Sequence, residues 1–285
     1  MDLLAIALIL AAACCHATWN FLIKRLNGGP ELVWLFSLVS SVIYLPLVVV
    51  IMLLERPTFG AMELIFLAGS GALHLAYFLL LQQGYRRGDL SVVYPTARAS
   101  GPLLSITFAV LILGEYMTVQ ILGGGLAIII GVFFLTGGFR SRTSNLRASL
   151  GFGLATGVLI GSYTAWDAYA VTALMLSPLI VDYASAVLRT VALAPYAAAR
   201  KPLVLGFWRD HKGAVIVIAV LNSLAYILFL IAVTLTPLVY AAPAREISVL
   251  LTVMLGTLIL KEGSFRGRIG WAALILAGML LLATG

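Results

Sequence analysis

The sequence predicts an all-α integral membrane protein with ten transmembrane helices, arranged as two inverted five-helix repeats around a central cavity. Of its 285 residues, 62% are hydrophobic and only 10% are charged, whereas a soluble domain carries about 25% charged residues. The apolar stretches are about 20 residues long, the length that a helix needs to cross a bilayer. They lack the short alternating pattern of membrane β-strands.

Polar, glycine and proline residues interrupt the apolar sequence and define the ends of the helices. In order, the breaks lie at Lys24–Pro30, Glu55–Gly60, Tyr85–Asp89, Gly114–Tyr116, Gly138–Arg147, Thr172–Pro178, Arg200–Lys212, Thr234–Pro237 and Lys261–Arg268. Proline cannot continue the hydrogen bonding of a helix, and charged residues are costly within lipid. We therefore expect helices at 3–23, 31–54, 62–84, 90–113, 118–138, 149–171, 178–199, 213–234, 238–260 and 269–284.

The second half of the chain repeats features of the first. At an offset of 147 positions, corresponding residues are Trp19 and Trp166, Arg98 and Arg245, Glu115 and Glu262, Gly123 and Gly270, and Gly131 and Gly278. Five helices are an odd number, so the second copy would enter the membrane in the opposite sense, as in many secondary transporters. We expect a first repeat at 1–140, a cytoplasmic connecting loop at 141–148 and a second repeat at 149–285.

Basic residues predict the orientation of the chain. If the predicted helices alternate in direction, one face collects 14 of the 18 lysine and arginine residues, and the other face carries Arg56 alone. Such asymmetry assigns the first face to the cytoplasm. Both termini are therefore expected outside, in the periplasm of a Gram-negative bacterium.

Three arginines, Arg98, Arg189 and Arg245, fall within predicted helices. An arginine at mid-membrane costs on the order of 3 kcal/mol on insertion scales, and such residues usually face a bundle interior or a watery cavity. Arg98 and Arg245 hold corresponding positions and suit a carboxylate or phosphate. Alternatively they are structural, satisfying helix carbonyls or pairing with Glu246 or Asp182.

Prolines and tyrosines accompany two of these arginines. Pro95 and Pro243 each remove a backbone donor and free a carbonyl within a helix. Irregular backbone at membrane depth is tolerated only against protein or water. Together with Tyr94 and Tyr240, the prolines favour placing these two helices on the inner wall of the cavity, and a kink without functional consequence is the alternative.

Four other helices carry polar and aromatic residues that we assign to the same cavity. They are His16, Trp19 and Asn20, Tyr163 and Trp166 with Asp167 beside them, His74 and Tyr77, and Asn222 and Tyr226. The alternatives are an interfacial aromatic belt for the tryptophans and hydrogen bonds between helices for the others. Histidine titrates near neutral pH, so a proton-coupling role for His74 is a further hypothesis.

Glu115 and Glu262 stand where one predicted helix ends and the next begins. A carboxylate there interacts favourably with the N-terminus of the following helix, so we expect a structural role. The sequence shows no metal-ligand spacing and no nucleotide-binding loop. We therefore expect no metal and no cofactor.

These features together resemble the drug/metabolite transporter superfamily, and within it the ten-helix EamA-type permeases. The resemblance rests on Gly88-Asp89-Leu90-Ser91-Val92-Val93-Tyr94-Pro95, Arg98, Pro102, Gly114-Glu115, Gly123 and Gly131, with the copy in the second half. It covers essentially the whole chain and implies alternating-access transport of small polar metabolites, often export. Within the family the chain looks most like the bacterial amino-acid exporters of the inner membrane, whose aromatic-lined cavity handles neutral and aromatic amino acids.

The expected function is therefore a secondary transporter that exports small metabolites, above all amino acids. Its partners would be a small-molecule substrate and the lipid bilayer, without nucleic acid. A drug, sugar phosphate or nucleotide sugar is an alternative substrate in the same fold. A membrane enzyme is disfavoured because acids such as Glu55, Asp89 and Asp210 are scattered, and a passive channel is the remaining alternative.

Overall fold

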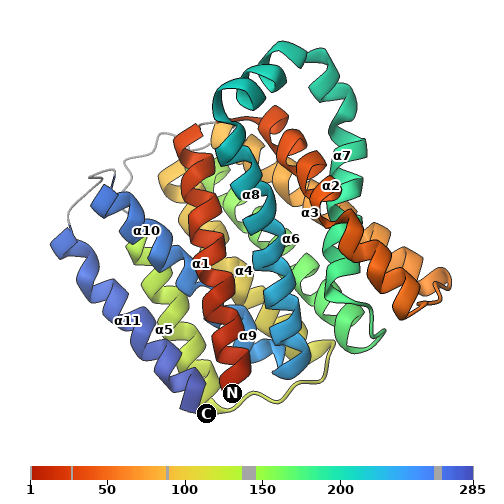
Figure 1. Ribbon diagram of the computed structural model, residues 1–285. Helices are drawn as coiled ribbons and strands as arrows, with labels where there is room; N and C mark the ends of the chain where they lie inside the picture. Colours follow the sequence, from red (N-terminus) through yellow and green to blue (C-terminus); the bar gives the residue numbers. More distant parts are fainter. Residues whose placement is uncertain (1, 27, 88–89, 137–145, 260–264, 285) are drawn as a thin grey trace.

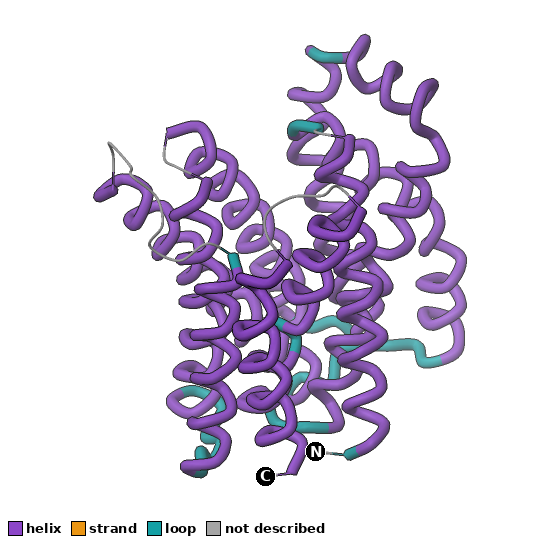
Figure 2. Tube along the Cα trace, turned by 90° about the vertical axis from the view of Figure 1, so that its left-hand side faces the viewer, coloured by secondary structure: helices purple, strands orange, loops and turns teal. Residues whose placement is uncertain are grey.

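The computed structural model describes residues 2–26, 28–87, 90–136, 146–259 and 265–284, and the described residues contain no strand (Figures 1 and 2). The helices are α1 Leu3–Leu26, α2 Pro30–Leu54, α3 Ala61–Arg87, α4 Leu90–Leu111, α5 Val119–Leu135, α6 Leu146–Thr172, α7 Pro178–Ala199, α8 Lys201–Leu235, α9 Leu238–Ala244, α10 Ile247–Ile259 and α11 Phe265–Thr284. The predicted all-α membrane fold is confirmed. Within the described part, six helices are long and apolar enough to cross a membrane.

The predicted loop at 200–212 is wrong, because this segment forms the first part of α8. Pro202 lies in the first turn, where its missing N–H interrupts no helical hydrogen bond. The backbone then bends at His211, with φ −136° and ψ 26°, before the apolar part of the helix begins. The segment turns away from the bundle in Figure 1 and exposes Lys201, Arg209 and Lys212.

The predicted single helix at 238–260 is two helices, α9 and α10, separated at Arg245 and Glu246. Pro243 has no N–H to continue the α-helical ladder. Tighter bonds replace it: Glu246 N donates to Pro243 O at 3.0 Å, and Val249 N donates to Glu246 O at 2.9 Å. The residues flanking the break are buried, as irregular backbone within a membrane requires.

Helices α4 and α6 approach each other closely. Gly153, Gly157 and Gly161 repeat every four residues and therefore share one face of α6. A Cβ atom at Gly161 would lie 2.7 Å from Leu104 Cβ and 3.2 Å from the Ser105 backbone nitrogen of α4. Small residues at this spacing allow two membrane helices to touch along their backbones.

Other extensive contacts pair α1 with α8, α3 with α6, α2 with α7, and α5 with α11. Two of these pairs, α1–α8 and α6–α3, correspond to each other under the proposed duplication. The repeat boundaries themselves stay a prediction. Of the predicted connecting loop, residues 141–145 lie outside the described residues, and residues 146–148 begin α6. Both termini lie at the same end of the bundle (Figures 1 and 2).

Some glycines of α5 and α11 lie where the two helices touch, and others do not. A Cβ at Gly278 would lie 2.7 Å from the carbonyl oxygen of Gly124, and one at Gly131 would lie 2.6 Å from Ile275 Cγ1. Gly123 and Gly270 instead face open space. Gly123 and Gly270 therefore take no part in this close helix packing among the described residues.

Candidate functional site

Arg98 connects three parts of the bundle. Its Nη2 lies 3.1 Å from Nε2 of His16 on α1, and its Nη1 lies 3.8 Å from Oε1 of Glu246 at the α9–α10 break. Because arginine has donors only, His16 Nε2 accepts this hydrogen bond. The guanidinium carbon also lies 5.6 Å from the Tyr94 ring centroid. We call His16, Tyr94, Arg98 and Glu246 the charged cluster.

Arg245 has different surroundings. Its guanidinium carbon lies 4.5 Å from the ring centroid of Phe229 on α8, a distance typical of cation–π attraction. Its side chain is partly exposed, and the guanidinium makes no hydrogen bond or ion pair with the described residues.

A second cluster gathers side chains from α3, α6 and α8. The ring of His74 lies 4.1 Å from that of Tyr163 and 5.2 Å from that of Tyr226, and Tyr77 lies 5.6 Å from Tyr163. Tyr226 donates a hydrogen bond to Oδ2 of Asp167 at 2.5 Å. We call these five residues the aromatic cluster.

Residues of α8 link Arg245 to the aromatic cluster. The rings of Tyr226 and Phe229 stack with centroids 6.1 Å apart, and Phe229 in turn lies beneath Arg245. A cation, three tyrosines and a buried carboxylate thus occupy one region at the middle of the bundle. The chemistry of these groups is complementary to a carboxylate, an apolar ring and an ammonium group.

Trp166 and Trp19, which were predicted to hold corresponding positions at the cavity, have different surroundings. The indole N–H of Trp166 donates to the Phe66 carbonyl at 2.9 Å, and its ring stacks on Phe66 and covers Gly69. Trp166 thus joins α3 to α6 by packing. Trp19 contacts the charged cluster edge-on through His16, with ring centroids 4.8 Å apart.

The other predicted cavity residues lie at the margins. Tyr240 packs against the core and Pro243 is buried against Gly125. Asn20 has a buried amide nitrogen without a described partner, and Asn222 is partly buried. The side chain of Pro95 and all of Glu262 lie outside the described residues.

Glu115 acts on a different helix from the one predicted. Its two carboxylate oxygens accept hydrogen bonds from the backbone N–H groups of Leu238 and Val239, at 2.7 and 2.8 Å. It therefore caps α9 in the second half of the chain. The following helix, α5, is capped by Thr118, whose hydroxyl accepts from the N–H of Ile121.

Arg189 binds other residues than the members of the two clusters. It donates to the hydroxyl groups of Ser185 on its own helix and Ser37 on α2, at 3.2 and 3.4 Å. The described structure shows no ion pair between Arg189 and Asp182. The structure thus favours packing between α2 and α7 for this arginine.

Asp167 and Glu246 complete the two clusters, although neither was among the predicted site residues. Both are buried, with exposed fractions of 0% and 1%. Their signal in the sequence was an acidic residue deep in an apolar stretch, which is costly in a membrane. Asp167 also follows Tyr163 by four residues, so the two share a helix face.

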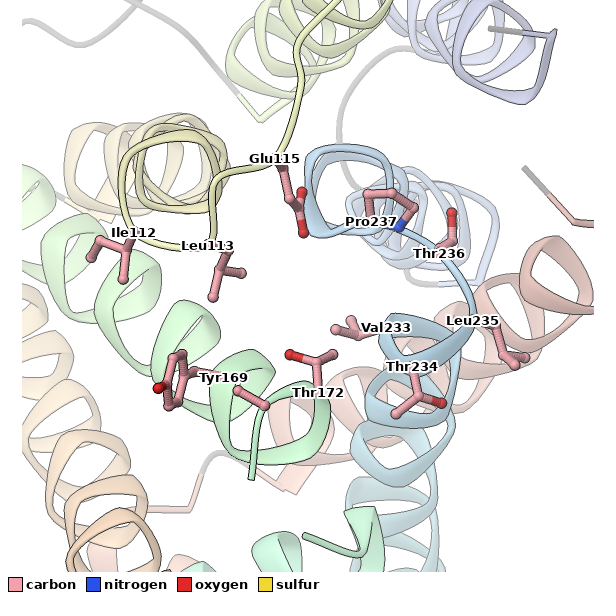
Figure 3. A pocket seen from close by; sticks show the side chains of 11 residues that line it. Ile112, Leu113, Glu115, Tyr169, Thr172, Val233, Thr234, Leu235, Thr236 and Pro237 are labelled. Carbon is pink, nitrogen blue, oxygen red and sulfur yellow. The ribbon is translucent and has the colours of Figure 1, made fainter. Parts of the chain in front are cut away.

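A cavity of about 450 Å³ lies at the end of the bundle that carries both termini (Figure 3). Figure 3 shows side chains from the ends of α4, α6 and α8 around it, with Glu115 at its edge. None of the residues predicted to bind substrate lines it. Val233 on its wall is four residues beyond Phe229 on α8, about 6 Å along a helix.

Comparisons with known proteins support the resemblance. The model of the EamA-like transporter family matches residues 3–137. This half of the chain carries the EamA-like transporter sequence. The EamA-type resemblance is therefore confirmed for the first half of the chain, and the matching family is one of membrane transporters of small solutes.

A solved crystal structure described as "Crystal structure of protein" has the same fold, with a TM-score of 0.77. The match covers 98% of this chain and 96% of that chain at 14% sequence identity. The fold similarity thus extends over both halves of the chain. A search of curated proteins found no match.

Proposed function

We propose that this EamA-type transporter exports amino acids, preferring neutral and aromatic ones, by alternating access. The observation that carries the proposal is Arg245, whose guanidinium has no hydrogen-bond partner among the described residues and lies on Phe229 beside the aromatic cluster. An α-carboxylate can accept a bidentate hydrogen bond from such a group. The tyrosine rings can contact an apolar side chain or an ammonium group.

Arg98 contributes differently to this proposal. It is already engaged by His16 and Glu246, so it holds α1 and α4 against the α9–α10 break. A change in these contacts during transport would alter how three helices meet. We therefore assign substrate contact to Arg245 and a positioning role to Arg98.

A sugar phosphate is the second candidate substrate, because two arginines correspond in the proposed repeats. A phosphate carries up to two negative charges and favours more than one free cation. The pairing of Arg98 with Glu246 leaves Arg245 as the better available cation, which favours the singly charged carboxylate.

We assign the cavity at the end of the bundle with both termini as the outer vestibule of the transporter. The opposite end carries the predicted cytoplasmic charges, including Arg200, Lys201 and Arg209, as expected for a bacterial inner-membrane protein. In this proposal, the two five-helix repeats rock about the clusters and open them alternately to the vestibule and to the cytoplasm.

The test is a flux assay with purified protein in liposomes and a panel of labelled solutes. The panel contains phenylalanine, leucine, glucose 6-phosphate and a lipophilic cation. We expect saturable flux and counterflow of the two amino acids. Flux of the phosphate or the cation without amino-acid flux would contradict the substrate assignment, and non-saturable flux without counterflow would indicate a channel.

A further inference from the structure

A further cavity lies at the end of the bundle opposite the termini, between the start of α2, the end of α7 and the first part of α8. Its volume is about 560 Å³, within the range of about 300–1,000 Å³ that is typical of ligand pockets. Its walls include Trp34, Leu38, Ala198, Lys201, Leu205 and Trp208. We call this cavity the apolar groove.

The lining of the apolar groove suits a hydrocarbon chain. Among the residues that line it, Lys201 alone is charged. The indole N–H of Trp34 already donates to the carbonyl oxygen of Thr190 at 2.9 Å, so this side chain offers its ring to an occupant. A polar metabolite would lose hydrogen bonds to water here and regain few, which is costly. A hydrocarbon chain loses none.

The first part of α8 places charge beside this apolar lining. Lys201, Val204, Leu205 and Trp208 follow one another at intervals of up to four residues and line the groove from one helix face. Leu203 and Leu205 are each 53% exposed, although basic residues stand at both ends of the segment. Exposed leucines among basic residues are typical of a helix that lies in the membrane interface. Figure 1 shows this segment between the end of α7 and the apolar part of α8.

The basic residues near the groove have little acidic compensation. Residues 200–212 contain four basic residues and one acid, and that acid pairs with Arg209 at 2.8 Å. Lys201 is exposed and makes no hydrogen bond or ion pair with the described residues. Lys212 contacts only the ring of Trp208, with its Nζ 5.4 Å from the centroid. The edge of the groove is therefore complementary to an anion.

The groove also lies at the depth where lipid headgroups meet the hydrocarbon. Trp34 is four residues after Pro30, the first residue of α2, which is about 6 Å along a helix. Ala198 lies in the last turn of α7. Tryptophan is enriched at this boundary of the membrane. The molecules that surround the groove are thus lipids, with their phosphates near Lys201.

We propose that the apolar groove binds one anionic phospholipid, whose acyl chain lies against Trp208 and whose phosphate is bound by Lys201. Basic pockets between membrane helices are suited to anionic headgroups. A zwitterionic lipid is bound less tightly, because its own cationic group offsets the attraction to the lysine. The bound lipid joins the first part of α8 to α2 and α7. This inference is independent of the transported substrate.

Quenching of tryptophan fluorescence by brominated lipids tests the site in the intact transporter. The protein is placed in phosphatidylcholine vesicles with increasing fractions of phosphatidylglycerol that carries bromine on its acyl chains. The signal of Trp208 is the fluorescence that Trp208→Phe lacks. We expect its half-quenching at an about fivefold lower fraction of brominated phosphatidylglycerol than of brominated phosphatidylcholine, the effect of one lysine near an anionic headgroup. Equal quenching by the two lipids would contradict the proposal.

Two variants with the same change of charge separate a bound lipid from general attraction to a basic surface. Lys201→Gln removes the charge that lines the groove, so the preference for phosphatidylglycerol should disappear. Lys212→Gln removes a charge eleven residues further along α8, about 16 Å along a helix, and outside the lining. It should retain the preference. If the two variants behave alike, no lipid is bound specifically at Lys201 and the proposal is wrong.

A larger side chain in the groove provides a test that leaves every charge in place. Ala198→Phe puts a ring into the groove and should weaken the quenching of Trp208 by phosphatidylglycerol. Ala199→Phe is the control, because Ala199 is the next residue but does not line the groove. Both alanines are exposed, so both variants should fold. Quenching of Ala198→Phe equal to that of the wild type would overturn the proposal.

The same samples reveal another occupant of the groove. If Trp208 resists quenching by both lipids and light scattering shows a dimer, a second copy of the chain covers the groove. If Trp208 resists quenching in a monomer, the groove is closed to lipid. Either result overturns the proposal, whichever solute the transporter moves.

Discussion

Arg98 and Arg245 differ in what surrounds their charges, and this difference predicts different effects of mutation. Arg98 pairs with Glu246, whose carboxylate is buried and has no hydrogen-bond donor among the described residues. Removing one partner of a buried ion pair typically costs 3–5 kcal/mol, because the other charge stays buried alone. We therefore expect Arg98→Ala to lower the thermal unfolding midpoint of the purified transporter strongly.

The matched comparison for Arg98→Ala is the double variant Arg98→Met, Glu246→Gln, which removes both charges. This double variant should be nearly as stable as the wild-type protein. Arg209→Ala, at an exposed position paired with Asp210, should leave the midpoint unchanged. Equal stability of Arg98→Ala and wild type would show that the pair contributes nothing. Arg245→Gln should leave the fold intact, because no described ion pair or hydrogen bond is lost.

The contact between α4 and α6 holds both clusters in register, because α4 carries Arg98 whereas α6 carries Tyr163 and Asp167. We expect Gly161→Ala to be destabilising by about 1–3 kcal/mol, since the added methyl group would meet Leu104 Cβ and the α4 backbone. Substrate flux should fall with it. Thermal unfolding and counterflow measure the two effects.

Gly151→Ala is the control on the same helix, because nothing lies within 4 Å of a Cβ at that position. It should be neutral or slightly stabilising, since alanine has the higher helix propensity. If both variants behave alike, the close α4–α6 approach is not needed for the site.

The helices themselves could largely be predicted from hydropathy, whereas their interruptions could not. Pro202 looked like a helix breaker, but proline in the first turn begins a helix. Pro243 did mark a break, yet only the surrounding burial shows that the backbone separates at Arg245 and Glu246. Glu115 was correctly expected at a helix terminus. The terminus that it caps, however, belongs to a helix more than 120 residues away in the sequence, and such a long-range contact cannot be predicted from the residues around Glu115.

For the site, the sequence identified residue types better than it identified neighbours. The cost of polar groups in a membrane pointed to His74, Tyr77, Tyr163 and Tyr226, which the structure brings together. The same argument could not separate Trp166, which packs against Phe66, from residues of the cluster. Which side of an aromatic ring faces a ligand depends on helix rotation, and hydropathy does not specify it.

Membrane orientation is a property of the complete transporter and can be tested without a substrate. In a variant with Cys14 and Cys15 replaced by serine, a cysteine replaces either Tyr116, which is 92% exposed near the cavity, or Arg209, which is 81% exposed on α8. We expect a membrane-impermeant maleimide added to bacterial cells with a permeable outer membrane to label Tyr116→Cys alone. Labelling of Arg209→Cys alone would show that the cavity faces the cytoplasm, which contradicts the proposed orientation.

The most direct test of the account is whether Arg245 recognises a carboxylate. Phenylalanine and phenethylamine share a ring and an ammonium group, but phenethylamine has no carboxylate. In counterflow competition, phenylalanine should inhibit the wild-type transporter about tenfold more strongly than phenethylamine does. This factor corresponds to about 1.4 kcal/mol of binding free energy, which phenethylamine loses because it lacks the charged hydrogen-bond partner of Arg245.

Arg245→Gln should abolish that preference, and Arg209→Gln should retain it. The predicted result is thus a strong discrimination that disappears only when the Arg245 guanidinium is removed. Undiminished discrimination by Arg245→Gln, in protein that still transports, would contradict the central claim that this arginine binds the substrate carboxylate.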